Sequence, residues 1–273
     1  MRAMQRSPAS VVVTVLAGLA STVVLGAQQR GAAPAAQNPA PPPVRVAVTV
    51  TQVKPDMLGT YQDLIKNEAN PGLKKAGLTY RWMFTPVFGQ GFTFVSVQPI
   101  ANFAQYDQPG ALQRAIGADG VANYNAKLRP TLVSTQTSIE TMNQALSILG
   151  GMTAPPVAVV VQTFQIVSGK GADFNAIMTS DYIPAYKKAG VKDFWVYNTN
   201  FGGPGGEVIT VRPIANFAEL DQPGLLNRAG LTAEAIQQLN AKRNAFIAST
   251  ETEVERLVPD LSFGMPLMQA AQR

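Results

Sequence analysis

Apolar and polar positions follow the same order twice along the chain, and this order predicts two similar halves. Each half opens with an apolar, β-branched run, VRVAVTVTQV at 44–53 and VAVVVQTFQI at 157–166. Runs of this length and composition are typical of buried strands. A helical spacing of apolar residues follows each run and ends at KKAG, where lysines before a glycine indicate a helix stop.

Two further strands around a glycine-rich turn come next in each half, at 79–100 and 192–214. In the first of these hairpins, Tyr80, Trp82 and Phe84 fall on one face, and Met83 and Val87 fall on the other. A sheet that is apolar on both faces must be covered on both. The pattern therefore predicts helices on one side of each sheet and a second layer on the other.

One stretch of the chain occurs twice almost unchanged. Residues 99–115 read PIANFAQYDQPGALQRA, and 213–229 read PIANFAELDQPGLLNRA, with differences at only four of the seventeen aligned positions. Outside this stretch the halves align with an offset that stays between 113 and 115 residues. Self-similarity at so long a period indicates a duplicated domain rather than a solenoid.

A longer helical pattern and a final alternating run complete each half. The alternating runs, STQTSIETM at 134–142 and STETEVERL at 249–257, predict a last strand. The order β–α–β–β–α–β is that of a ferredoxin-like unit. The predicted fold class is α+β, with two tandem ferredoxin-like repeats whose antiparallel sheets pack face to face, as in a fused homodimer.

The element order, the hairpin and the P-I-x-N-F-A-x-x-D block give the chain a resemblance to the dimeric α+β barrel superfamily. That superfamily includes antibiotic-biosynthesis-type monooxygenases and NIPSNAP-like, EthD-like and chlorite-dismutase-like proteins. The resemblance covers 44–263 in tandem and is greatest to an exported bacterial branch. It implies a fused pseudo-dimer that is monomeric. In the monooxygenase branch it also implies a reaction of an aromatic substrate with O₂ without metal or flavin.

The N-terminus has the layout of a secretory signal peptide. MRAMQR is followed by an uncharged apolar run at 11–27 and then by Ala- and Pro-rich residues. The alternative is an uncleaved anchor, although about 17 apolar residues are few for a span. We expect export to the periplasm or the medium, with no membrane contact after cleavage. The predicted division is 1–27 signal peptide, 28–43 Ala/Pro-rich linker, 44–148 first repeat, 149–156 linker, 157–263 second repeat and 264–273 tail.

Composition excludes several kinds of chemistry. Only 14% of residues are charged, the net charge is +5, and no basic run suggests a nucleic-acid partner. The chain contains neither cysteine nor histidine. Disulfides, zinc sites of the Cys/His kind, Ser-His-Asp and Cys-His nucleophiles and a haem held by a proximal His are therefore impossible. We expect no metal and no cofactor.

The two tryptophans occupy equivalent positions on the second strand of each half. Aromatic walls with a few polar groups are typical of ligand pockets, whereas the alternative role is that of core anchors beneath the helices. The second hairpin is the more polar one and offers donors. We expect a pocket between a sheet and its own helices, lined by Trp82, Trp195, Tyr197, Asn198 and Arg212.

Three functions agree with the sequence. The first is binding of a small, partly apolar aromatic ligand outside the cytoplasm. The second is a cofactor-independent, monooxygenase-like reaction on an aromatic substrate. The third is a structural or interaction module without a ligand. An open interior favours the first two, and a filled interior favours the third.

Overall fold

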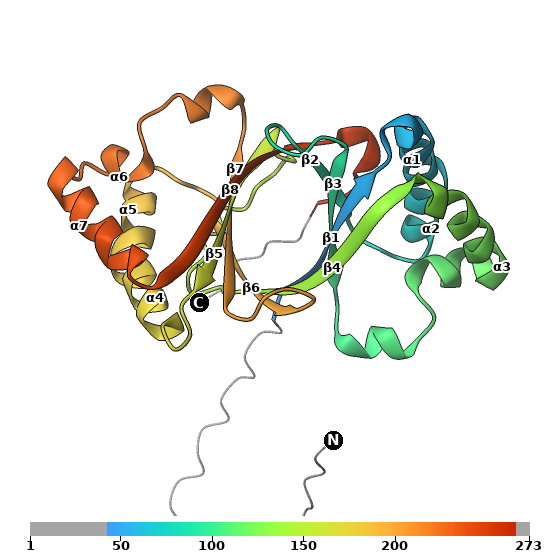
Figure 1. Ribbon diagram of the computed structural model, residues 1–273, viewed down its shortest axis with the longest axis horizontal. Coiled ribbons are helices and arrows are strands. Elements are labelled where there is room, and N and C mark those ends of the chain that lie inside the picture. The colour runs from blue at the N-terminus through green and yellow to red at the C-terminus, as the bar shows by residue number, and fades with distance from the viewer. Residues whose placement is uncertain (1–42, 266–273) are drawn as a thin grey trace, which may run out of the picture. The chain divides into compact units, whose positions relative to one another are not determined.

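The computed structural model describes residues 43–265 and confirms the predicted element order in both halves (Figure 1). The predicted signal peptide and most of the linker before the first repeat lie outside these residues, as does most of the C-terminal tail. In the described range, no helix is both long and apolar enough to cross a membrane. The first half contains β1 (Arg45–Val53), α1 (Leu58–Leu64), α2 (Asn70–Lys75), β2 (Trp82–Pro86), β3 (Thr93–Ile100), α3 (Ala111–Leu128) and β4 (Leu132–Met142). The second contains β5 (Ala158–Ile166), α4 (Gly171–Ile177), α5 (Ile183–Lys188), β6 (Trp195–Phe201), β7 (Glu207–Ile214), α6 (Leu225–Arg228), α7 (Ala233–Asn244) and β8 (Ile247–Leu257).

The eight strands form one closed barrel in the order β1-β3-β2-β8-β5-β7-β6-β4. Within each half the four strands lie in the order expected of a ferredoxin-like sheet, and all pairs are antiparallel. The two sheets join edge to edge at two seams, β2–β8 and β4–β6. Helices cover the outside of the barrel on two opposite sides (Figure 1). The fold class predicted from the sequence is therefore confirmed.

The two halves are related by a pseudo-twofold rotation about the barrel axis. Equivalent strands are four places apart in the barrel order and run in the same direction. Backbone hydrogen bonds across the seams repeat accordingly. The Val258 N–H donates to the Met83 carbonyl at 2.8 Å, and the Asn143 N–H donates to the Val196 carbonyl at 2.7 Å. Each half thus completes the edge of the other.

Side chains alternate along each strand between the helical layers and the barrel interior. Met83 and Phe94 face the helices of the first half and pack there with Tyr61. Phe164 and Phe174 form part of the corresponding cluster in the second half. The side chains on either side of these strand positions therefore point into the barrel, where a third buried cluster lies.

The first helical segment of each half runs through a proline. Pro71 and Pro184 lie in the first turn of α2 and α5. A π-helical turn, Ile65–Ala69 or Met178–Tyr182, links each of these helices to the preceding one without a break. The wider π-helical turn comes just before the proline, which has no N–H to donate, and the helix continues past the proline.

Candidate functional site

A cavity of about 330 Å³ lies inside the barrel, between the two sheets. Both halves contribute to it through inward-facing strand positions. Its aliphatic wall consists of Val46, Val48, Val95, Val97, Val159, Val161, Ile209 and Val211. The predicted position of the pocket, between a sheet and its own helices, is therefore wrong for this cavity. The reason is that the sheets join at their edges without filling the interior.

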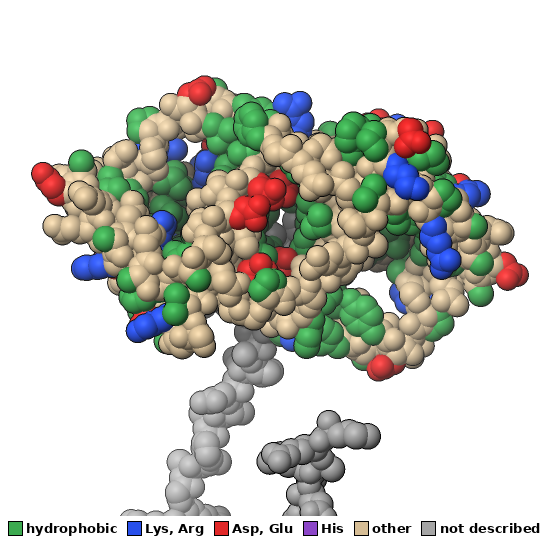
Figure 2. Space-filling model, viewed as in Figure 1, with side chains coloured by type: hydrophobic (Ala, Val, Ile, Leu, Met, Phe, Trp, Pro, Cys, Tyr) green, Lys and Arg blue, Asp and Glu red, His purple; other side chains and the backbone are tan. Residues whose placement is uncertain are grey.

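The two ends of the barrel differ. At the end where β1 and β5 begin, Leu149, Met152 and Met265 pack against the interior cluster. At the hairpin end, the cavity is bordered by the exposed Gln90 and the half-buried Glu253. Figure 2 shows a hollow at the centre of the visible face with acidic side chains around it. Access to the cavity is therefore from the hairpin end.

Aromatic side chains from both halves meet in the cavity. The ring centroids of Trp82 and Trp195 are 6.3 Å apart, with an angle of 37° between the ring planes. Trp82 also contacts Tyr80 and Phe84 edge to face, at 6.2 and 6.1 Å. Such contacts hold rings in defined orientations. Both tryptophans therefore lie in the barrel interior. The alternative role, in which they anchor the core beneath the helices, does not agree with this position.

The two indole N–H groups have different environments. Nε1 of Trp82 donates to the carbonyl of Gly264 at 3.0 Å. Nε1 of Trp195 is buried and has no hydrogen-bond partner among residues 43–265. An unpaired buried donor costs about 1–3 kcal/mol. Trp82 is therefore fixed by a hydrogen bond, whereas packing alone holds Trp195.

Two buried carboxyl groups occupy equivalent positions in the two halves. Glu140 on β4 and Glu255 on β8 are each only 5% exposed. Burial raises the pKa of Glu140 to about 7, against the smaller opposing effect of a hydrogen bond from the Ser138 hydroxyl (3.0 Å). Burial raises the pKa of Glu255 to about 8, and the charges of Glu253 and Glu140 add to this. Near neutral pH, Glu255 is therefore mostly protonated, and Glu140 exists in both its protonated and its ionised form.

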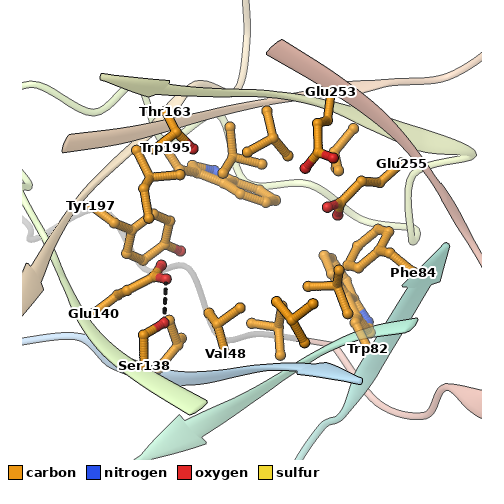
Figure 3. A pocket seen from close by; sticks show the side chains of 18 of the residues that line it. Val48, Trp82, Phe84, Ser138, Glu140, Thr163, Trp195, Tyr197, Glu253 and Glu255 are labelled. Carbon is orange, nitrogen blue, oxygen red and sulfur yellow. Dashed lines mark hydrogen bonds between the residues drawn. The ribbon is translucent and has the colours of Figure 1, made fainter. Parts of the chain in front are cut away.

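The two sides of the cavity carry different polar groups (Figure 3). On one side, Tyr197 lies beside Glu140, and burial raises the pKa of the tyrosine hydroxyl, so that it stays protonated. On the other, Glu253 and Glu255 lie above Phe84. Burial also raises the pKa of Glu253. One side therefore combines carboxyl groups with hydroxyl groups, and the other has two carboxyl groups next to an aromatic ring.

Three of the five residues predicted to form the site lie together in the cavity, namely Trp82, Trp195 and Tyr197. The structure does not bring the other two to it. Arg212 points to the outer face, where its Nη1 is 3.6 Å from Glu219 Oε2. Asn198 borders a separate surface pocket beside β5. Both are neighbours of inward-facing residues along their strands, so the alternation of side chains turns them outward.

The sequence analysis did not identify the glutamates of the cavity. Glu140 and Glu255 align at an offset of 115 residues and fall on inward positions of the last strands. The sequence signal that could have identified them is a glutamate that occurs in both halves at an inward-facing position of the last strand. Among the described residues, no three potential ligands of the His, Cys, Asp or Glu type lie close enough together to hold a metal ion.

Comparisons with known proteins find relatives by structure alone. No protein-family model and no curated protein sequence matches the chain. A proposed monooxygenase from Lactobacillus acidophilus matches with a TM-score of 0.52 and 9% identity, over 81% of this chain and 95% of its own. An anthrone oxidase-like protein matches with a TM-score of 0.54 and 12% identity, over 85% and 97%. A variant of the chlorite dismutase from Candidatus Nitrospira defluvii matches with a TM-score of 0.50 and 10% identity, over 80% and 92%.

These similarities agree on the fold. Each of the three structures matches about four fifths of this chain, so the likeness spans the whole tandem barrel. At identities of 9–12%, the likeness concerns the architecture and not the chemistry. The dimeric α+β barrel fold that the sequence resemblance implied is therefore confirmed.

Proposed function

We propose that this protein binds a planar, partly apolar small molecule inside its barrel, outside the cytoplasm. The observation that supports this most directly is the unfilled interior of about 330 Å³, into which both tryptophans project. Apolar walls with a few polar groups are the usual composition of small-molecule sites. A planar aromatic body would pack against the indole rings, and its polar atoms would meet Tyr197 and Glu140. An interaction module would not need such a space.

Binding is expected to quench the fluorescence of the protein. The chain has only two tryptophans, and both line the cavity, so the signal reports directly on this site. Titration with 9-anthracenemethanol should give saturable quenching with a Kd of about 1 μM. Trp195→Phe should remove more of the signal than Trp82→Phe, because the ring without a hydrogen-bond partner adapts to the ligand. If no member of a panel of neutral and charged tricyclic compounds quenches saturably, the proposal fails.

A second candidate is oxidation of an anthrone-like substrate by O₂ without a cofactor. The position of Glu140 beside Tyr197 supports it, since a carboxylate with a pKa of about 7 can accept a proton from an acidic C–H group. Two structures of the same fold are described as a proposed monooxygenase and an anthrone oxidase-like protein. In this reaction the methylene carbon loses two hydrogens and gains one atom of O₂. The other oxygen atom leaves as water, and the product is the quinone.

Oxygen uptake tests this second candidate. With anthrone present, the protein should consume O₂ faster than buffer does, and Glu140→Gln should lower the rate by about 100-fold because the proton acceptor is lost. Glu234→Gln, which removes an exposed carboxylate from α7, should leave the rate unchanged. A rate equal to that of buffer would reject the oxidation and leave the binding proposal standing.

A further inference from the structure

We propose that the ligand of the cavity is an organic cation, whose positive nitrogen lies at the corner formed by Glu253, Glu255 and Phe84. This inference rests on the proposed function, and it specifies the class and the orientation of the ligand. Three observations support it: the charges that line the cavity, the absence of a cation to balance them, and the difference between its two sides.

The charges that line the cavity all have one sign. Four glutamates border it, and among residues 43–265 no lysine or arginine lines it. The potential inside is therefore negative whenever any of these groups is ionised, and a narrow space with apolar walls strengthens such a potential. A ligand with a carboxylate would meet repulsion, whereas a ligand with an ammonium or aromatic nitrogen cation would be attracted. The bordering glutamates are Glu140, Glu207, Glu253 and Glu255.

Two of these carboxyl groups have no partner in the described part of the chain. Glu207 accepts a hydrogen bond from Thr199 (2.5 Å), and Glu140 accepts one from Ser138. Neither Glu253 nor Glu255 takes part in a side-chain hydrogen bond or an ion pair among residues 43–265. Burial makes the ionised form of Glu255 unfavourable, so this group is protonated unless water in the cavity or a charge from outside the chain stabilises it. A bound cation would provide that charge.

The side chains at this corner differ from those at the equivalent positions of the other half. Ser138 in the first half takes the place that Glu253 takes in the second, and Tyr197 takes the place of Phe84. One corner therefore has Glu140 and Glu207, each of which accepts a hydrogen bond from a hydroxyl group. The other has two carboxyl groups without such a partner, beside an aromatic ring without a hydroxyl. The second arrangement suits a cation, because a carboxylate pair supplies charge and an aromatic face adds a cation–π contact.

The seam at this corner is also the shorter one. β2 pairs with β8 only over Phe84–Pro86, whereas β6 continues to Phe201. Pro86 stands where β6 has Thr199, and one further backbone hydrogen bond, from the Val87 N–H to the Val254 carbonyl (2.7 Å), continues the seam. The half-buried Glu253 borders the cavity at the hairpin end, where the cavity is open. A cation entering from that end would meet this carboxyl group first, with its aromatic body directed toward Trp82 and Trp195.

Three probes with the same tricyclic frame test the inference by calorimetric titration of the full chain. They are 10-methylacridinium, which is permanently cationic, neutral 9-anthracenemethanol, and anionic 9-anthracenecarboxylate. At about pH 8.5 the cation should bind at least about tenfold more tightly than the neutral probe, and the anion more weakly than either. At about pH 5.5 the preference for the cation should decrease, because the carboxyl groups are then protonated. The titratable groups facing the probe are Tyr80, Glu140, Tyr197, Glu207, Glu253 and Glu255.

Variants locate the cation within the cavity. Glu255→Gln should weaken binding of 10-methylacridinium by about tenfold or more, while the affinity for 9-anthracenemethanol changes by less than about twofold. Glu234→Gln, which removes the same charge from an exposed position, should change neither. Equal affinity for the cationic and neutral probes, or an equal loss of both in Glu255→Gln, would overturn the inference while leaving the proposed function intact. Failure of all three probes to bind would contradict the proposed function itself.

Discussion

Replacing Glu255 by glutamine is expected to stabilise the protein in alkaline solution and to leave its stability almost unchanged in acid. Burial raises the pKa of this carboxyl group from 4.5 to about 8. The folded state therefore keeps a proton that the unfolded chain releases above about pH 4.5. The contribution of this raised pKa to the free energy of unfolding is complete below about pH 4.5, and it is lost as the pH rises toward 8. At about 1.4 kcal/mol per pKa unit, the ionised group costs on the order of 5 kcal/mol at high pH.

Urea unfolding at about pH 5 and about pH 9 measures this effect. The parent protein should lose stability between the two pH values, and Glu255→Gln should lose several kcal/mol less. Glu140→Gln should show the same trend with a smaller size, because the pKa of Glu140 is raised only to about 7. Glu234→Gln should follow the parent protein at both pH values. If Glu255→Gln and the parent lose the same free energy, Glu255 is solvated in the folded state and the description of the cavity is wrong.

Replacing Gly202 by alanine is expected to destabilise the β4–β6 seam. Gly202 has a positive φ of 79°, and a Cβ there would lie 2.1 Å from the carbonyl oxygen of Thr137 on the neighbouring strand. Alanine would therefore add a backbone clash to the cost of a left-handed conformation. Together these effects should lower the free energy of unfolding by roughly 2–5 kcal/mol.

The repeat supplies a matched control for this substitution. Gly89 is the equivalent residue of the first hairpin and also has a positive φ, of 99°, but a Cβ there would meet no atom within 4 Å. Gly89→Ala should therefore cost only about 1–2 kcal/mol, the cost of the conformation alone. Chemical denaturation of the two variants measures the difference. Equal losses would show that the neighbouring strand moves aside and that the seam is not rigid at this point.

Much of the fold follows from the sequence because the signals are local and occur twice. The alternation in 79–100 correctly places Trp82 on the opposite face from Met83. The Thr232 hydroxyl accepts a hydrogen bond from the Ala235 N–H and caps α7, as its position before a helical pattern indicates. Such features depend on residues a few positions apart. The duplication made the strand alternation visible a second time, whereas the cap occurs only in the second half of the described chain.

The site was less accessible to sequence analysis because it depends on long-range pairing. Whether two sheets enclose a space is decided at seams that join strands far apart in the chain, such as β2 and β8. Glu140 and Glu255 lie in Thr-rich runs that look solvent-exposed until the opposite sheet covers them. The most similar stretch of the two halves, in contrast, lies outside the cavity. Its arginines support the surrounding chain, as when Arg228 donates to the carbonyl of Ala189 at 2.9 Å.

The fusion of the two halves into one chain has a stereochemical consequence. In a dimer of identical chains, both corners of the cavity would carry the same side chains, and any ligand could bind in two equivalent orientations. Here Tyr197 opposes Phe84, and Ser138 opposes Glu253. The barrel keeps its twofold architecture, while the two sides of the cavity are distinct. The two orientations of a ligand bound there would therefore no longer be equivalent and would differ in free energy.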